Sequence, residues 1–301
     1  MSTVYGRIEA NRRRTWVLLA FFLFFVAMVA AVLAAAMGFG LEAIPLALIL
    51  AGLVSFISYY SSDSIVLAIS QAEEVKHDEN PELYHLVENL CIGAGLPTPR
   101  VYLIEDTAPN AFATGRDPKH AVVVLTRGLV QKLDKLELEG VIAHELSHIR
   151  NYDIRLMGIV VVLVGIVALL ADWFFRFTWY GSGRRSSNRS RGEGGLGAIL
   201  LILALIMAIL APIAAGLIRA AISRRREFLA DADAALLTRY PEGLARALEK
   251  ISADPEPLEV ANKATAHLYI VNPLKDHSSW LNNLFSTHPP VEERIAALRA
   301  M

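Results

Sequence analysis

Four stretches of the chain are almost entirely apolar. The first, residues 15–36, holds about 22 residues and would be roughly 33 Å long as a helix, enough to cross the core of a bilayer. The others cover residues 43–60, 156–171 and 196–222. The pattern predicts four transmembrane helices arranged as two hairpins.

Arginines determine the expected orientation. Four of them precede the first apolar stretch, whereas the loop at residues 37–42 has neither Lys nor Arg. The positive-inside rule therefore places the N-terminus and the residues after 60 in the cytoplasm. The first stretch is also longer than the apolar region of a signal peptide, about 7–15 residues, so we expect it to be retained as an anchor.

A Gly/Ser/Arg-rich linker at residues 181–195 separates the third and fourth stretches. It contains four Arg, yet four full crossings would put it outside the cell. Either the first hairpin fixes the topology and the linker is carried across, or the second pair is only partly inserted. The sequence leaves both alternatives open.

Two polar stretches, of about 95 and about 80 residues, are long enough to fold. We therefore expect four parts. These are an N-terminal transmembrane hairpin at 1–60, a cytoplasmic region at 61–155, a second transmembrane hairpin with its linker at 156–222, and a second cytoplasmic region at 223–301.

The composition agrees with a membrane protein. Hydrophobic residues make up 54% of the 301 residues, charged residues only 20%, and the mean hydropathy is +0.41. This excludes a disordered chain, and a single cysteine, Cys91, excludes a disulfide scaffold. The net charge of -1 gives no basic signature for nucleic acid.

Local signals predict the elements of the first cytoplasmic region. Asn80 and Gly95 bound an amphipathic helix at Pro81–Ala94, and Asp134 with Glu137 forms a capping box at the start of another helix. Strands are expected at 101–104 and 122–126, with a short helix from Thr126.

The helix that follows Asp134 contains the sequence HELSH. His144 and His148 are one helical turn apart, so both imidazoles can bind one metal ion. Glu145 lies beside them and can take a proton from a metal-bound water. This is the HExxH zinc motif, although a surface helix with two unrelated histidines would also contain it.

A metal site needs a further protein ligand, and the best candidate follows the fourth apolar stretch. Glu227 and Asp231 are four residues apart on one helical face. Glu227 can ligate, and Asp231 can accept the N–H of a ligand histidine. The alternative is a solvated acidic face.

These segments together resemble the HtpX-type membrane zinc metalloproteases, relatives of the integral-membrane CAAX prenyl proteases. The resemblance depends on HELSH at 144–148, a membrane hairpin, and SRRREFLADADA at 223–234. Further matching segments are NPELYHLVENL at 80–90, GLPTPRVYLIED at 95–106, PNAFATG at 109–115 and FSTHPPVEERIAAL at 285–298.

The resemblance implies an α-helical integral membrane protein with an α+β, zincin-like catalytic domain that is cytoplasmic. It also implies one Zn²⁺ per chain, bound by His144, His148 and Glu227, with Glu145 as the general base. His288 would stabilise the oxyanion. From the residues alone, Thr287 or His288 before a proline pair predicts the start of a helix.

Residues 110–114 alternate as an edge strand does, and a substrate peptide can add to a free edge through main-chain hydrogen bonds. A turn-rich connection between core strands is the alternative. The resemblance favours a substrate-binding strand formed by Asn110, Ala111, Phe112 and Ala113.

Because both metal-binding segments flank the second hairpin, we expect the site at the cytoplasmic surface of the cell (inner or plasma) membrane in a multi-pass protein. The expected partners are the lipid bilayer and protein or peptide substrates, chiefly membrane proteins. A role in quality control and stress response follows from the resemblance alone. The alternatives are a CAAX-type prenyl-peptide protease, a non-enzymatic scaffold or transporter with a vestigial site, and a zinc hydrolase acting on other bonds; the oligomeric state stays open.

Overall fold

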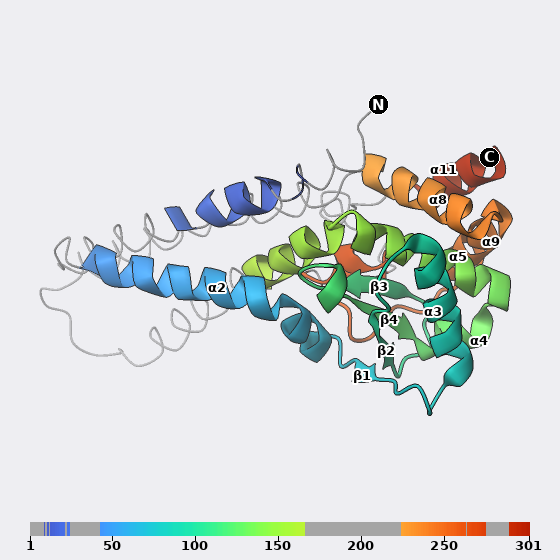
Figure 1. Ribbon diagram of the computed structural model, residues 1–301, viewed down its shortest axis with the longest axis horizontal. Helices are drawn as coiled ribbons and strands as arrows, with labels where there is room; N and C mark the ends of the chain where they lie inside the picture. The colour runs from blue at the N-terminus through green and yellow to red at the C-terminus, as the bar shows by residue number, and fades with distance from the viewer. Residues whose placement is uncertain are drawn as a thin grey trace, which may run out of the picture.

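The computed structural model describes residues 9, 11, 13–21, 23, 24, 43–165, 224–262, 264–274 and 289–301. A small mixed sheet and the helices around it form the α+β part of the molecule (Figure 1). Its strands are β1 (Glu73–Glu74), β2 (Arg100–Ile104), β3 (Ala111–Thr114) and β4 (Val122–Thr126). Its helices are α3 (Pro81–Ala94), α4 (Arg127–Lys132), α5 (Lys135–Arg150), α8 (Arg224–Thr238), α9 (Pro241–Ala253) and α11 (Val291–Arg299), with short 3₁₀ turns at Pro118–His120 and Ala266–Leu268.

The sheet has the strand order β1-β2-β4-β3. β2 and β4 are parallel, whereas β1 pairs with β2 and β3 pairs with β4 in the antiparallel sense. Ala111 lies opposite Leu125 and Thr114 lies opposite Val122. β3 is therefore an edge strand of this sheet, as the alternation of residues 110–114 predicts.

The pleat of β4 divides its side chains between two cores. Val123 and Leu125 join a core built with α3, α5, α8 and α9, whereas Val122 and Val124 join a second core on the other face. Phe112 of β3 lies in the second core and contacts Tyr269 edge to face. Because both faces are covered, β4 is apolar along almost its whole length.

The helix ends follow the caps that the sequence predicts. The Asn80 side chain accepts a hydrogen bond from the Leu83 N–H, and Gly95 ends α3 in the left-handed conformation at φ 65°. Asp134 and Glu137 form the reciprocal capping box at the start of α5, with both hydrogen bonds at 2.9 Å. The predicted helices at 81–94 and from Asp134, and both predicted strands, are confirmed.

Helix α5 lies between the sheet and the pair α8 and α9 (Figure 1). A Cβ atom on Gly140 would come within 2.7 Å of the Leu244 backbone nitrogen, so glycine allows α9 to approach α5 closely. This packing buries α5 from Leu138 to Ile149, apart from the half-buried Glu139. Residues 144–148 are thus fixed inside the molecule rather than on a surface helix.

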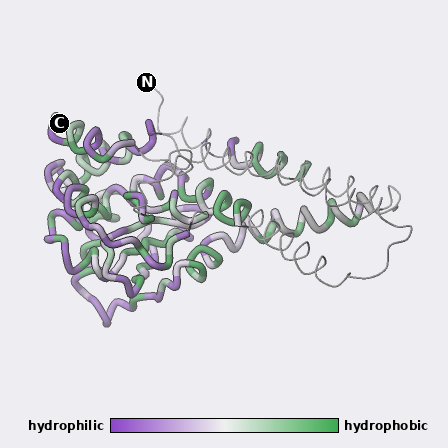
Figure 2. Tube along the Cα trace, turned by 180° about the vertical axis from the view of Figure 1, so that it is seen from behind, coloured by the Kyte–Doolittle hydropathy of each residue, from purple (hydrophilic) through white to green (hydrophobic). Residues whose placement is uncertain are grey.

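Helix α2 (Ala43–Ile69) includes the second apolar stretch and projects away from the sheet (Figure 1). Figure 2 shows hydrophilic residues along the outer helices and loops of the α+β part. Within the residues that the structure describes, no helix combines the length and the apolar character needed to cross a membrane. The four crossings, the two hairpins and the four-part division of the chain stay predictions; most of the second hairpin and the whole linker lie outside the described residues.

The helix predicted at the proline pair is present, but it starts later than predicted. Helix α11 begins at Val291 with Pro290 as its N-cap, not at Thr287 or His288. Both prolines precede the helix, and no side chain caps this end; the Pro290 carbonyl accepts hydrogen bonds from the Glu293 and Arg294 N–H groups. Thr287 and His288 themselves lie outside the described residues.

Candidate metal centre

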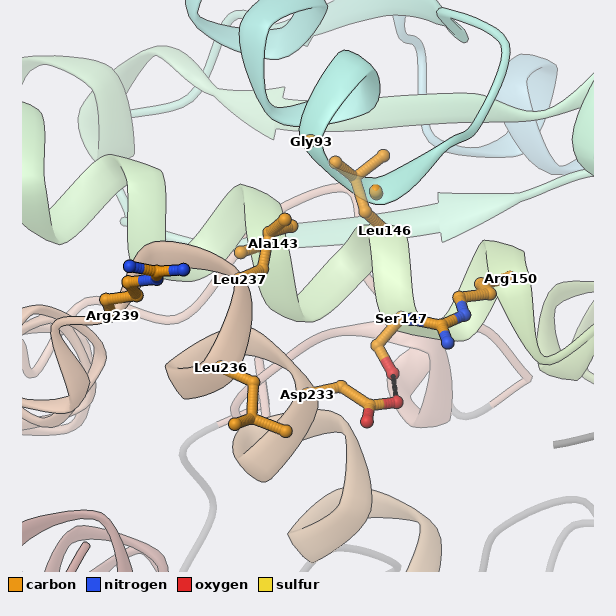
Figure 3. Close-up of a pocket in the computed structure, with 10 residues that line it drawn as sticks. Gly93, Ala143, Leu146, Ser147, Arg150, Asp233, Leu236, Leu237 and Arg239 are labelled. Carbon is orange, nitrogen blue, oxygen red and sulfur yellow. Dashed lines mark hydrogen bonds between the residues drawn. The ribbon is translucent and has the colours of Figure 1, made fainter. Parts of the chain in front are cut away.

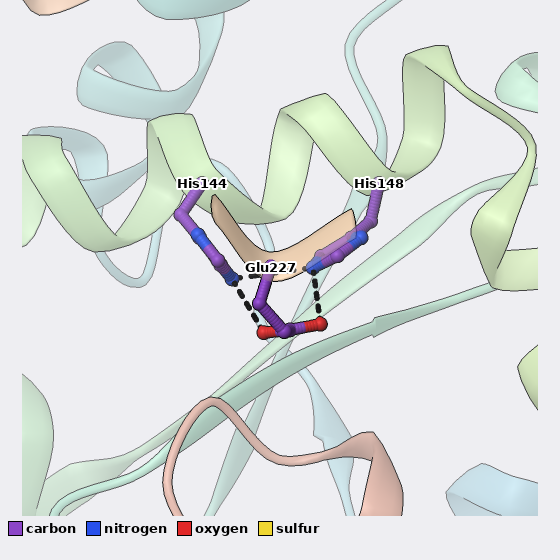
Figure 4. A group of neighbouring side chains, drawn as sticks. All are labelled: His144, His148 and Glu227. Atoms are coloured by element: carbon purple, nitrogen blue, oxygen red, sulfur yellow. Dashed lines mark hydrogen bonds and ion pairs between the residues drawn. The ribbon is translucent and has the colours of Figure 1, made fainter. Parts of the chain in front are cut away.

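The two histidines of HELSH extend from the same face of α5 (Figure 4). Their Nε2 atoms are 3.2 Å apart, and both side chains are almost completely buried. The hydrophobic packing of α5 on both sides holds this face in place. The helix therefore presents two imidazole nitrogens to one point.

Glu227 comes from the first turn of α8 and reaches both imidazoles. One of its carboxylate oxygens lies 3.7 Å from His144 Nε2 and the other lies 3.7 Å from His148 Nε2 (Figure 4). The side chain is 2% exposed. Three donor atoms from two helices thus surround one small volume.

This donor set fits a metal ion. In a tetrahedral zinc site with bonds of about 2.0–2.2 Å, neighbouring donor atoms lie about 3.3–3.6 Å apart. The two Nε2 atoms, 3.2 Å apart, lie close to that range, and each of them is 3.7 Å from a different oxygen of the Glu227 carboxylate. Two imidazoles with one carboxylate, all within 4.8 Å of one another, can hold a divalent ion and leave a fourth position for water.

Each histidine is oriented by a carboxylate on its other nitrogen. His144 Nδ1 lies 2.9 Å from Asp231, and His148 Nδ1 lies 3.2 Å from Asp153. An N–H donated from each Nδ1 leaves the Nε2 lone pair for a metal. Asp231 is where the sequence predicts it, whereas Asp153 was not among the predicted site residues.

Neighbouring cations keep both carboxylates charged although they are buried. Burial alone would raise the pKa of Asp231, but the Arg294 guanidinium and His144 hold that pKa well below its usual range. For Asp153, burial is outweighed by His148 and Arg226, which also lower the pKa. Each imidazole therefore has a buried, negatively charged carboxylate beside its Nδ1 atom.

Three comparisons identify relatives of this chain. The sequence model of peptidase family M48 matches residues 77–301. The chain belongs to peptidase family M48. A protease HtpX homolog from Dictyoglomus thermophilum is 48% identical over 299 residues, 99% of this chain and 95% of the relative. A protease HtpX homolog from Ligilactobacillus salivarius is 43% identical over 299 residues, 99% of this chain and 100% of the relative.

The crystal structure of S. mikatae Ste24p is also similar, with a TM-score of 0.45 and 20% identity. That match covers 81% of this chain and 58% of that one, so the chain spans little more than half of its length. Together with the family assignment, the HtpX homologs show that this M48 member is a metallopeptidase.

In this M48 peptidase, Glu145 follows His144 on α5 and is 2% exposed. Burial raises the pKa of its carboxyl, against the opposing effect of the two histidines. A carboxylate with a raised proton affinity beside the metal-binding nitrogens is suited to accept a proton from water. Glu145 is not one of the three grouped donors, which leaves it available for that role.

Arg294 is a functional residue that the sequence analysis missed. It lies on α11, is completely buried, and binds Asp231 through two hydrogen bonds of 2.7 and 2.8 Å. Its third nitrogen donates to the Ile270 carbonyl and lies 3.8 Å from Glu227. One signal could have revealed it: Val291, Arg294 and Leu298 share one helical face, which places an arginine among core positions.

The predicted substrate strand is partly occupied by the chain itself. Asn110 precedes β3, and its side chain donates to the Val271 carbonyl at 3.0 Å. The Ala111 carbonyl, on the free edge of β3, accepts from the Ile270 N–H at 3.0 Å. The Ala113 backbone has the same orientation two residues on and makes no backbone hydrogen bond at this edge to the described residues, although Ala113 is only 3% exposed.

A hollow of about 670 Å³ lies behind α5 (Figure 3), on a face of this helix that does not include His144 and His148. Ser147 donates to Asp233 there at 2.8 Å, which links α5 to α8. Its other lining residues come from the end of α3, from α5 and from the end of α8: Gly93, Ala94, Ala143, Leu146, Arg150, Leu236, Leu237 and Arg239. Because helical periodicity separates this face from His144 and His148, the hollow is not the metal centre.

The charge around His148 gives a pH-dependence prediction. Burial lowers the pKa of His148, but the hydrogen bond to Asp153 and the charges of Glu227, Asp153 and Glu145 outweigh it and raise this pKa to about 9. Below that pH the metal-free ring holds a second proton, which metal must displace. Apparent zinc affinity should therefore increase about tenfold per pH unit from roughly pH 6 to 8.

A competition titration with a chelator, corrected for the chelator's own protonation, measures this slope. Affinity independent of pH over the same range would show that His148 does not lose a proton on binding metal.

Proposed function

We propose that the chain is a zinc-dependent endopeptidase of the cell membrane that cleaves misfolded or cytoplasm-exposed parts of membrane proteins. The observation that carries the catalytic part of this proposal is the triad of His144, His148 and Glu227. One donor atom from each residue lies within 4.8 Å of the other two, inside a chain of peptidase family M48. The family assignment favours an enzyme over a scaffold with a vestigial site.

Each residue has a defined task in this proposal. Zinc, when bound, would polarise the scissile carbonyl and make a water molecule acidic. Glu145 takes the proton of that water and delivers it to the leaving amine, so no covalent intermediate is needed. Asp231 and Asp153 keep the imidazoles in the tautomer that binds metal, and Arg294 holds Asp231. His288 stays the proposed oxyanion stabiliser.

The outer edge of β3 at Ala113 favours binding of an extended peptide, although the side chains of this strand are buried in the structure. A substrate strand would add beside Ala113 through backbone hydrogen bonds, where the described residues supply no partner. Recognition through the backbone depends little on side chains, which suits cleavage of many unfolded sequences. Since Ile270 already bonds to Ala111, the substrate strand would extend from Ala113 away from that contact.

The position of the site along the chain supports a membrane-surface location. α8 begins at Arg224, directly after the fourth predicted transmembrane stretch, and Glu227 is its fourth residue. At about 1.5 Å per residue, Glu227 would lie roughly 7.5 Å beyond the end of the predicted span. The positive-inside rule makes this the cytoplasmic side. Loops and ends of membrane proteins at that surface are then the nearest substrates.

Three substrates distinguish this function from its alternatives when they are presented to zinc-loaded protein in detergent. These are unfolded casein, a membrane protein with a destabilised cytoplasmic loop, and a prenylated peptide beside its unprenylated form. We expect casein and the destabilised loop to be cut. Cleavage restricted to the prenylated peptide would instead assign a CAAX-type protease. Hydrolysis of none of them by metal-loaded protein would contradict the proposal.

A further inference from the structure

Asp153, which orients His148, is itself held from three directions. It is 3% exposed and follows the C-cap residue of α5 by two positions. One carboxylate oxygen accepts from His148 at 3.2 Å. The other accepts from Arg226 at 3.1 Å and from the Asn11 side-chain amide at 2.8 Å. Since the two oxygens share one rigid plane, the contacts on the second oxygen determine where the first one points.

Asn11, near the N-terminus of the sequence, contacts Asp153. Its amide nitrogen donates one hydrogen bond to Asp153 and another, of 2.9 Å, to the Asn151 backbone carbonyl. Both N–H groups of the amide are therefore used, and the side chain is 4% exposed. Asn11 contacts the turn at residues 151–153 on two sides, across sequence separations of 140 and 142 positions.

That turn has a backbone conformation that needs support. Tyr152 lies between the two contacted residues and has φ 59°, in the left-handed region that a bulky residue rarely adopts. A turn of this kind persists when its neighbours fix it. Asn11 supplies contacts to both neighbours of Tyr152, so it fixes the turn from which Asp153 reaches His148.

We propose that Asn11 is a positioning residue for the metal centre, acting through Asp153 on His148, and that the enzyme is therefore competent only while its N-terminal segment is seated. Asn11 contacts neither the metal donors nor the substrate edge. Its effect is to hold the carboxylate that keeps the His148 lone pair directed at the metal. This inference rests on the proposed zinc-peptidase function.

The test compares full-length wild type with Asn11→Ala and Asn11→Asp. The matched control is Thr15→Ala, one helical turn further on. Thr15 is also buried, and within the described part of the chain its hydroxyl donates to the Asn11 backbone carbonyl, at 3.0 Å. The readouts are zinc affinity by chelator competition, the visible spectrum of cobalt-substituted protein, the separate values of kcat and KM on casein, and thermal unfolding.

We expect Asn11→Ala to lower zinc affinity and kcat by about tenfold and to change the cobalt spectrum, with KM within about twofold of wild type. Asn11→Asp places a second carboxylate against Asp153 and should lower zinc affinity and kcat further. This second variant tests the proposal even if the alanine variant folds poorly. Thr15→Ala should match wild type. Unchanged zinc affinity and an unchanged spectrum in Asn11→Asp would overturn the proposal.

A double-mutant cycle with Asp153→Asn tests the route of the effect. If Asn11 acts through Asp153, Asn11→Ala should cause little further loss in the Asp153→Asn background. Fully additive losses would show that Asn11 acts elsewhere and would overturn the inference. Wild-type protein that binds no zinc or cuts no casein would instead refute the proposed function, so the two failures are distinguishable.

Discussion

Glu145→Gln is expected to abolish peptide-bond hydrolysis while the protein keeps its metal. Glutamine has nearly the same shape as glutamate but cannot accept the proton of the attacking water. Loss of a general base lowers turnover by about 10²–10⁴-fold. Zinc affinity should stay close to wild type, because the three donor atoms belong to His144, His148 and Glu227.

The measurement is casein turnover and zinc content for the two proteins prepared in parallel. Glu139→Gln is the matched control, since it makes the same chemical change two turns earlier on α5, on a half-buried residue away from the metal centre. That variant should be fully active. Equal activity of Glu145→Gln and wild type would mean that another group activates the water, or that a contaminating protease does the cutting.

Glu227→Ala is expected to lose activity because it no longer binds the metal, whereas Glu145→Gln keeps the metal. Removal of this carboxylate leaves two imidazoles as the protein ligands, and structural and catalytic zinc sites use at least three. Outer partners of a zinc ligand alone contribute about 10–100-fold in affinity, so loss of a direct ligand should exceed about 100-fold. Activity should return in part when zinc is added in large excess.

Asp233→Asn is the control for this change. Asp233 lies on the same helix, but its side chain faces the hollow behind α5 and accepts from Ser147 (Figure 3). Its variant should bind zinc as wild type does. If Glu227→Ala kept tight zinc and normal turnover, the third ligand would have to be a different residue.

Local sequence signals account for most of the catalytic fold. The caps at Asn80, Gly95 and Asp134 act within one helical turn, and all of them are found as expected. The pairing of His144 with His148 is also local, since it depends only on helical pitch. Glu227 and Asp231 could be predicted because their spacing again reflects a single helix face.

The remaining parts of the site depend on contacts between distant segments, which spacing does not reveal. Asp153 reaches His148 because the turn after α5 is held in a left-handed conformation. Arg294 reaches Asp231 from α11, 63 residues further along the chain. The contact of Ile270 with Ala111 is of the same kind, and it shortens the predicted substrate edge.

We propose that one metal ion at His144, His148 and Glu227 makes this chain a peptidase. The most direct measurement is a zinc titration of chelator-treated, full-length protein, with casein cleavage recorded at each addition. We predict no cleavage without metal, and activity that increases in proportion to zinc and levels off at about one ion per chain. Cleavage that continues at full rate without metal, or zinc that binds with no gain in cleavage, would contradict the claim.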